Sequence, residues 1–160
     1  MPTNQQPVLP ALDPRSVPER TGSFYPRAFR GPADERIRQA LGDALGLAQF
    51  GVNLVRLPPG AASALRHWHD QEDEFVYVLE GEATLITDAG QQVLGPGMAA
   101  GFPAGVEDGH HLINHGAGTA VYLEVGSRVP AEAVTYSDVD LKMQRKSGQR
   151  SYKHKNGQSY

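Results

Sequence analysis

Residues 60–81 read GAASALRHWHDQEDEFVYVLEG, and the spacing within this stretch decides the fold. His67 and His69 are two residues apart in a β-rich run, so strand geometry places both imidazoles on one face, about 6–7 Å apart at Cα. Glu74 follows a short polar turn at the start of the next β-rich run, so it can lie beside the histidine strand. The stretch predicts two paired strands that direct two imidazoles and one carboxylate toward a common interior.

A second stretch, GMAAGFPAGVEDGHHLIN (97–114), offers a further imidazole. A turn with proline and glycine precedes His110 and His111, either of which could complete a set of three nitrogens and one oxygen. Imidazole and carboxylate together suit zinc, iron, manganese, nickel, copper or cobalt. Four protein ligands leave an octahedral ion about two positions for water or substrate, which is the arrangement that catalysis needs.

The region from Phe50 to Ser127 alternates short β-rich runs with glycine and proline turns. The runs are FGVNLVRL, LRHWH, EFVYVLE, EATLITD, QQVL, MAAGF, HHLINH and TAVYLEVG. Short strands at such close spacing are typical of a β-sandwich or a small barrel. No helical stretch separates them, which excludes a parallel sheet built from strand–helix–strand units. The sequence predicts a β-barrel over residues 49–128.

The two flanks have a different character. Residues 1–48 are rich in proline and predict an extended arm, with one short helix over 33–45, where Ile37, Leu41 and Leu45 recur every four residues. Residues 129–160 have scattered aromatics and no clear period, which predicts a wrapping segment that ends in a basic tail. The basic residues are Lys142, Arg145, Lys146, Arg150, Lys153 and Lys155, with no acidic residue after Lys142. This tail is either solvated or docked on an acidic surface, and it could also reach a phosphate-bearing ligand.

The two stretches together resemble the paired motifs of the cupin superfamily. The matching residues are His67, Trp68, His69, Glu74 and Gly81 in the first motif and Gly97, Pro103, Gly105, His110 and Asn114 in the second. One departure is the loop 106–109, which has four residues where the family pattern has two. Counting back from Asn114 selects His110 as the third histidine ligand, with His111 as the alternative.

The resemblance extends to the segments LGDALGLAQFGVNLVRLPPG, EVGSRVP and HKNGQSY, which are similar to small bacterial single-cupin proteins. Some of these proteins are labelled as sugar-phosphate isomerases. The resemblance implies an all-β fold, the cupin double-stranded β-helix, which is a jelly-roll-like small barrel. It also implies one divalent metal ion (zinc, iron, manganese or nickel), held by His67, His69, Glu74 and His110.

Other polar residues near the motifs have less definite roles. Asn114 shares the strand phase of His110, so it could hydrogen-bond a metal ligand or simply cap the end of its strand. Glu72 and Asp73 lie on the turn before Glu74 and are expected to be solvated. No acid or base in phase with the metal ligands is evident, so the catalytic groups stay unassigned.

The ligand set is compatible with several functions. The leading hypothesis is a metal-dependent isomerase for a small oxygen-rich metabolite, such as a sugar or hydroxy-acid derivative, with the metal as Lewis acid. An iron(II) dioxygenase or a decarboxylase fits the same ligands, and a non-catalytic ligand-binding or metal-binding cupin is the third possibility. The side chains that line the interior discriminate between a catalytic and a non-catalytic function, because a purely apolar cavity offers no group that could transfer a proton.

Composition narrows the partners and the location. The 160 residues contain no cysteine, which excludes disulfides and thiolate metal sites, and no apolar run approaches the ~20 residues of a membrane span. The net charge of −3 argues against nucleic-acid binding. We therefore expect a cytoplasmic protein with no membrane or nucleic-acid partner. Residues 75–79 and 119–125 are apolar on both strand faces, which predicts that a homodimer covers the outer face.

Overall fold

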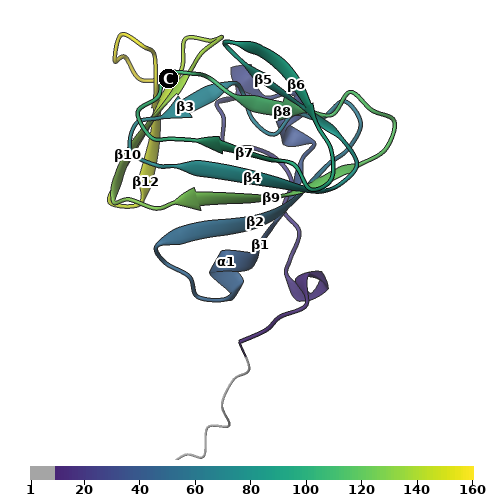
Figure 1. The fold of residues 1–160 in the computed structure, drawn as a ribbon. Helices are drawn as coiled ribbons and strands as arrows, with labels where there is room; N and C mark the ends of the chain where they lie inside the picture. Colours follow the sequence, from purple (N-terminus) through teal and green to yellow (C-terminus); the bar gives the residue numbers. More distant parts are fainter. Residues whose placement is uncertain (1–9) are drawn as a thin grey trace, which may run out of the picture.

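The computed structural model describes residues 10–160 and consists almost entirely of antiparallel strands. Its largest sheet has five strands in the order β1-β2-β9-β4-β7. They are β1 (Ile37–Ala40), β2 (Phe50–Leu57), β9 (Ala120–Ser127), β4 (Glu74–Glu80) and β7 (Ala99–Phe102). Figure 1 shows these strands stacked in this order through the middle of the molecule.

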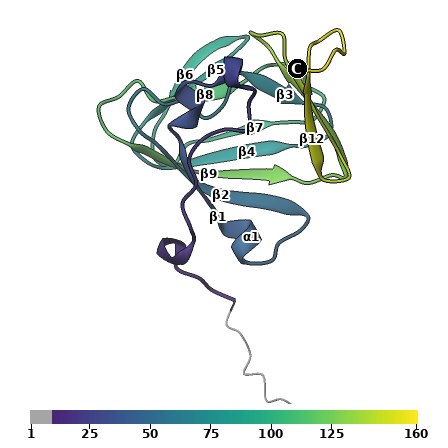
Figure 2. The ribbon, with the colours of Figure 1, turned by 180° about the vertical axis from the view of Figure 1, so that it is seen from behind.

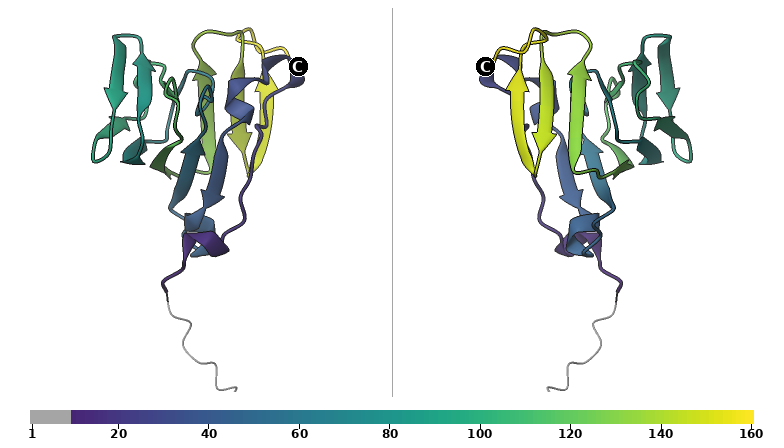
Figure 3. Two further views of the ribbon diagram at one scale, coloured as in Figure 1. Left: turned by 90° about the vertical axis from the view of Figure 1, so that its right-hand side faces the viewer. Right: turned by 90° about the vertical axis from the view of Figure 1, so that its left-hand side faces the viewer.

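Two smaller sheets complete the fold. One, in the order β6-β5-β8, contains β6 (Gly90–Leu94), β5 (Ala83–Thr87) and β8 (His111–Ile113). The other, in the order β12-β11-β10-β3, contains β12 (Gln149–Lys153), β11 (Lys142–Lys146), β10 (Ala131–Tyr136) and β3 (His67–His69). Figures 2 and 3 show the β5–β6 hairpin and the C-terminal strands on opposite sides of the molecule. All eight strands expected between Phe50 and Ser127 are present, and the all-β prediction is confirmed.

The alternation along β4 shows why these residues form a two-faced sheet. Val76 and Val78 are buried, whereas Phe75, Tyr77 and Leu79 are about 40% exposed on the other face. The inward residues belong to the main core, which consists of Val55, Leu57, Ala61, Val76, Val78, Ala83, Leu85, Leu94, Leu112, Ala120 and Tyr122. This core fills only part of the interior and leaves the region beside β3 and β10 to polar side chains.

Gly81 ends β4 in a conformation that only glycine adopts readily. Its φ is 68°, and a Cβ atom there would lie 2.5 Å from the carbonyl oxygen of Thr119. The turn therefore brings β4 directly beside the start of β9. Further along the same pair of strands, Glu74 lies opposite Gly126.

The helix predicted over residues 33–45 is wrong for most of its length. A 3-10 turn spans Pro32–Asp34, β1 takes Ile37–Ala40, and α1 contains only Leu41–Ala44. Pairing explains the difference, because β1 lies in register with β2 and also forms a bridge between Arg38 and Arg20. These ladder hydrogen bonds outweigh a weak helical preference.

The C-terminal segment also differs from the prediction, because residues 131–153 form three regular strands. These strands build a second core of Tyr25, Ala33, Val134, Tyr136, Leu141 and Met143. Tyr25 anchors the N-terminal arm here, with its ring edge-on to Tyr136 at a centroid distance of 5.4 Å. Two further 3-10 turns of the arm span Pro14–Ser16 and Arg27–Phe29, and residues 1–9 of the predicted arm lie outside the described residues. The domain boundaries at residues 48 and 128 stay a prediction.

Among residues 10–160, no helix combines the length and the apolar character that a membrane crossing would require.

Candidate metal centre

The short strand β3 carries both histidines of the His-x-His pair. It does not pair with β4, as the sequence predicted, but pairs on one side with β10, where His69 lies opposite Val134 and His67 opposite Tyr136. On the other side His67 forms a bridge with His110, through backbone N–H···O bonds of 3.2 and 2.9 Å in the two directions. His67 and His69 share one face of β3, as the spacing predicts, and their ring centroids are 5.1 Å apart.

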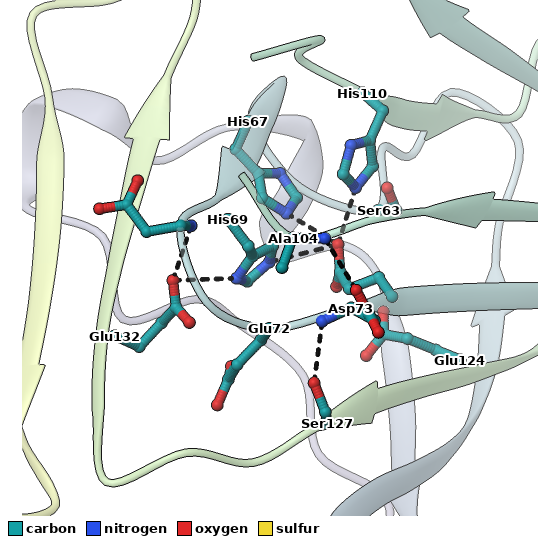
Figure 4. A network of polar contacts seen from close by, with 12 residues as sticks. Ser63, His67, His69, Glu72, Asp73, Ala104, His110, Glu124, Ser127 and Glu132 are labelled. Atoms are coloured by element: carbon teal, nitrogen blue, oxygen red, sulfur yellow. Dashed lines mark hydrogen bonds and ion pairs between the residues drawn. The ribbon is translucent and has the colours of Figure 1, made fainter. Parts of the chain in front are cut away.

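Three imidazoles converge on one carboxylate oxygen, Oε2 of Glu74. Figure 4 shows the rings of His67, His69 and His110 gathered at this centre. The Nε2 atoms of His67, His69 and His110 lie 3.3, 3.2 and 2.7 Å from it, respectively. The side chains come from β3, from the start of β4 and from the residue before β8, so a distant segment of the chain meets two neighbouring ones at this point. Ligand atoms of His67, His69 and Glu74 all lie within 4.8 Å of one another, the separation at which one cation can be shared.

The backbone sets the orientation of the His67 ring. Its Nδ1 lies 2.8 Å from the carbonyl oxygen of Leu65, and a carbonyl oxygen can only accept a hydrogen bond. Nδ1 must therefore carry the proton, which leaves the Nε2 lone pair directed at the centre. A backbone carbonyl behind a metal-binding histidine has this effect in many metalloproteins. The ring of His110 is held differently, by stacking on Phe102 at a centroid distance of 3.6 Å.

His111 and Asn114 have other partners. Nδ1 of His111 lies 3.0 Å from the carbonyl oxygen of Ala64, whereas His110 is the one in contact with Glu74. The amide of Asn114 donates to the carbonyl oxygens of Leu57 and Gly118, and its oxygen accepts from the backbone N–H of Gly116. Of the two roles expected for Asn114, these contacts are those of a residue that ties down the end of its strand.

Buried nitrogens without hydrogen bonds show that this cluster suits a metal ion. Within residues 10–160, Nδ1 of His110 and both ring nitrogens of His69 lack a hydrogen bond of acceptable geometry, although Nε2 of His69 is close to Glu74. Buried polar atoms left in this way cost free energy unless a ligand satisfies them. A divalent cation at the point where the Nε2 atoms meet would bind Nε2 of His69, although it would not reach the Nδ1 atoms on the far sides of the His69 and His110 rings. The donor set of imidazole and carboxylate fits the borderline first-row metals.

The charge state of Glu74 agrees with this role. Burial raises the pKa of the Glu74 carboxyl, but contacts with His110, His67 and His69 outweigh burial and leave the pKa well below its ordinary value. Burial lowers the pKa of His110. Burial also lowers the pKa of His69, but the hydrogen bond and the charge of Glu74 outweigh burial and raise it. Metal ligation needs the carboxylate together with neutral imidazoles, so a bound ion would compete with a proton at His69.

Of the two turn residues that were expected to be solvated, Asp73 is exposed and Glu72 is not. Glu72 is buried, and its carboxylate accepts hydrogen bonds from the backbone N–H of Val129, at 2.9 Å, and from Arg145. Asp73 accepts a 2.8 Å hydrogen bond from the backbone N–H of Ala104, which connects the turn to the loop after β7. Sequence reasoning missed both roles because their partners lie far away in the chain.

The centre opens into a cavity of ≈ 820 Å³ between the five-stranded sheet and the C-terminal sheet. Its walls are polar as well as apolar. Asn53 on β2 and Glu124 on β9 face it, joined by a 3.0 Å hydrogen bond from Asn53 Nδ2 to Glu124 Oε1. Tyr122 lies two residues before Glu124 on the same face, and burial raises the pKa of its phenol, which keeps the hydroxyl protonated. In the sequence, Glu124 is the one charged residue in the run TAVYLEV (119–125), and this exception in an otherwise largely apolar strand could have indicated a functional residue.

Comparison with known proteins agrees with the geometry. Residues 53–126 match the family model described as the Cupin domain. A sugar phosphate isomerase of the cupin superfamily from Silicibacter pomeroyi is 44% identical, with a TM-score of 0.91 over 94% of this chain and 96% of that chain. A search of curated proteins finds no match.

Two further solved structures are more distant. A protein from Acidithiobacillus ferrooxidans, described as a candidate sugar phosphate isomerase, is 35% identical, with a TM-score of 0.70 over 73% of this chain and 74% of that chain. The polyketide cyclase RemF from Streptomyces resistomycificus is 25% identical, with a TM-score of 0.59 over 75% of this chain and 80% of that chain. The extent of the first two matches, together with the family model, shows that the chain belongs to the cupin family.

Proposed function

We propose that the protein is a metal-dependent isomerase of a small sugar or hydroxy-acid derivative, in which His67, His69, Glu74 and His110 hold one divalent ion. His110 is preferred to His111 because its Nε2 atom, 2.7 Å from Glu74, shares the point where the other two imidazoles meet. A bound ion would supply Lewis acidity toward a substrate oxygen. The sugar phosphate isomerases similar to this chain support the choice of reaction.

The observation that carries the proposal is the carboxylate of Glu124 in the cavity beside the centre. Glu124 lies opposite Val76 on β4, two residues along the inner face from Glu74. Isomerisation moves a proton between adjacent carbons, so it needs a base close to the metal but outside the ligand set. Glu124 meets this requirement. An apolar lining would have favoured a binding protein instead.

The residues around Glu124 hold its carboxylate in position. Asn53 donates a hydrogen bond to it, which leaves the second oxygen facing the cavity. Arg36 lies nearby: burial lowers the pKa of this guanidinium, but the negative charge of Glu124 and other groups outweighs burial and raises it. Tyr122, protonated and buried, is a further donor toward a substrate hydroxyl.

Replacement of the proposed base tests the function. A Glu124→Gln variant is expected to lose about 10²- to 10⁴-fold in kcat, with little change in KM, because the amide keeps the hydrogen bond with Asn53 but accepts no proton. The assay follows interconversion of aldose and ketose sugars and their phosphates by protein loaded with zinc, manganese or iron. Metal content, measured on the same samples, is expected to be unchanged.

The matched control is Glu82→Gln, at an exposed position outside the cavity, which is expected to retain full activity. Two results would contradict the proposal. One is a wild-type protein that carries its metal and interconverts none of these pairs. The other is a Glu124→Gln variant whose kcat equals that of wild type.

We also propose that the protein is a homodimer, joined through the outer face of the five-stranded sheet. Phe50, Phe75, Tyr77 and Leu79 are each about 40% exposed there. Large apolar side chains gathered on one sheet face are typical of an interaction surface rather than of solvent-exposed surface. The covering of this face by a second copy agrees with the apolar character of both faces of β4.

Light scattering at micromolar concentration is expected to give twice the chain mass of 17.3 kDa. A Phe75→Asp, Leu79→Lys double variant is expected to run as a monomer, because charges in a buried interface are strongly unfavourable. The control, Val93→Lys, changes a more exposed apolar residue on β6, away from this face, and is expected to leave the dimer intact. A monomeric wild-type protein would refute the dimer.

A further inference from the structure

Arginines gather on the inner face of the five-stranded sheet, at the edge formed by β1. Arg36, Arg38 and Ala40 alternate along this edge and all face the cavity. The inner face continues through Asn53 on β2 and Glu124 on β9 to Glu74 on β4. Because neighbouring strands are about 4.8 Å apart, the β1 edge is about 14 Å from the strand that holds Glu74.

Two more arginines reach the same end of the cavity from other segments. Arg20, in the N-terminal arm, forms a backbone bridge with Arg38, with N–H···O bonds of 2.9 Å in both directions. Arg150, on β12, lies over the ring of Phe24 with its guanidinium carbon 5.2 Å from the centroid. The arm therefore contributes Arg20, the edge strand β1 contributes Arg38, and β12 contributes Arg150 to this end of the cavity.

These cations have no acidic partner of their own. Among residues 10–160, no carboxylate lies within ion-pair distance of Arg20, Arg38 or Arg150. Glu124 faces Arg38 at longer range. Burial lowers the pKa of Arg38, and the charges of Arg36, Arg150 and Arg20 lower it further. Like charges held together in a partly buried site cost free energy, which a bound anion would offset.

An unused donor lies in the same part of the cavity. The hydroxyl oxygen of Ser23 is buried and has no hydrogen-bond partner in the described chain, and Ser23 lines the cavity next to Phe24 in sequence. A buried hydroxyl without a partner is unfavourable unless a ligand supplies one. Ser23 and the arginines together form a site with several donors and an excess of positive charge.

We propose that Arg20, Arg38 and Arg150, with Ser23, bind the phosphate group of a phosphorylated substrate whose other end reaches the metal centre. The phosphate site does not depend on the proposed isomerase function; only the position of the rest of the substrate at the metal centre rests on it. Guanidinium groups bind phosphate oxygens in pairs, and a dianion balances several of them better than a single carboxylate does. The site thus selects for phosphate monoesters among small sugars and hydroxy acids.

The test is a calorimetric titration of the full chain with inorganic phosphate at fixed ionic strength. An Arg38→Gln, Arg150→Gln double variant is expected to raise the Kd for phosphate about tenfold or more relative to wild type. The matched control is Arg27→Gln, Lys146→Gln, which removes the same charge from exposed positions outside the cavity and is expected to bind like wild type. Arg150→Gln alone, at an exposed position, is expected to weaken binding without any risk to the fold.

Parallel titrations separate the anion site from the metal. A His67→Ala, His69→Ala variant is expected to keep the phosphate affinity of wild type, and malonate is expected to bind more weakly than phosphate. Equal weakening in the charge-matched control, loss of phosphate binding in the histidine variant, or tighter binding of malonate would each overturn the proposal. If the arginine variants lose phosphate while no isomerase activity is found, the anion site stands and the proposed reaction fails.

Discussion

Replacement of His67 and His69 by alanine is expected to yield protein with almost no bound metal, where wild type carries about one equivalent of a divalent first-row ion per chain. The two imidazoles supply two of the three nitrogens that meet at Glu74, so the remaining ligands bind an ion weakly. The measurement is elemental analysis of untagged protein purified without chelator or added metal. Circular dichroism of the same samples shows whether the fold survives.

Two single variants sharpen this result. His111→Ala is expected to keep the metal, because its Nδ1 atom contacts the Ala64 carbonyl oxygen rather than the centre, whereas His110→Ala is expected to lose it. His115→Ala, at an exposed position, is the control. Added metal is expected to raise the Tm of wild type and not that of the double variant. A double variant that keeps its metal, or a wild-type protein that binds no added divalent ion, would refute the site.

The identity of the metal also bears on the reaction. Iron in the purified protein would favour tests for a dioxygenase, whereas zinc or manganese would favour tests for an isomerase. The ligand atoms alone do not separate these reactions, because the same fold and donor set serve several chemistries. The carboxylate of Glu124 in the cavity is the feature that favours proton transfer.

An Arg145→Ala variant is expected to lower the free energy of unfolding by about 3–5 kcal/mol. Arg145, on β11, donates to the carboxylate of Glu72 and to the backbone carbonyl of Val129. The side chains of Arg145 and Glu72 are only 18% and 9% exposed. Removal of the guanidinium leaves a buried carboxylate with a single backbone donor. Urea unfolding followed by circular dichroism measures the loss.

Two comparisons test the cause of that loss. Lys146→Ala removes an exposed charge next to Arg145 on the same strand and is expected to change stability by less than about 0.5 kcal/mol. A Glu72→Ala, Arg145→Ala double variant is expected to be less destabilised than the sum of the two single variants, because the buried charge has been removed with its partner. Additive effects, or a loss below about 1 kcal/mol for Arg145→Ala, would show that the pair is not a significant source of stability.

The parts of the fold that sequence predicts well are those that local rules determine. The run of aromatic and β-branched residues along 75–79, glycine at the left-handed turn of Gly81 and the two-residue spacing of His67 and His69 each indicate a strand or its end without knowledge of the rest of the chain. The same rules place His67 and His69 on one face, with Glu74 close behind them in the chain. His110 lies 36 residues after Glu74, so local rules do not bring it to the centre, and only the resemblance of 97–114 to the second cupin motif selects it.

The remaining features depend on partners distant in sequence. Residues 37–45 have helical spacing, but β1 forms because Arg38 finds Arg20 and Val55 beside it. Strands β11 and β12 consist largely of polar residues, so their sequences alone do not indicate strands. They form because β11 pairs with β10 and β12 pairs with β11. Glu72 looks like a surface charge until Arg145 covers it. No local pattern contains these contacts, which is why the sequence did not indicate β1, the C-terminal strands or the burial of Glu72.

The pairing of β3 with β10 affects how the protein is made. During synthesis on a ribosome, both histidines of β3 emerge well before Val134 and Tyr136, the residues that complete their ladder. We expect the nascent chain to have no competent metal centre until most of the C-terminal segment has left the exit tunnel. The long sequence separation of this pairing makes it a slow step in folding. We therefore expect metal binding to follow the folding of the C-terminal segment.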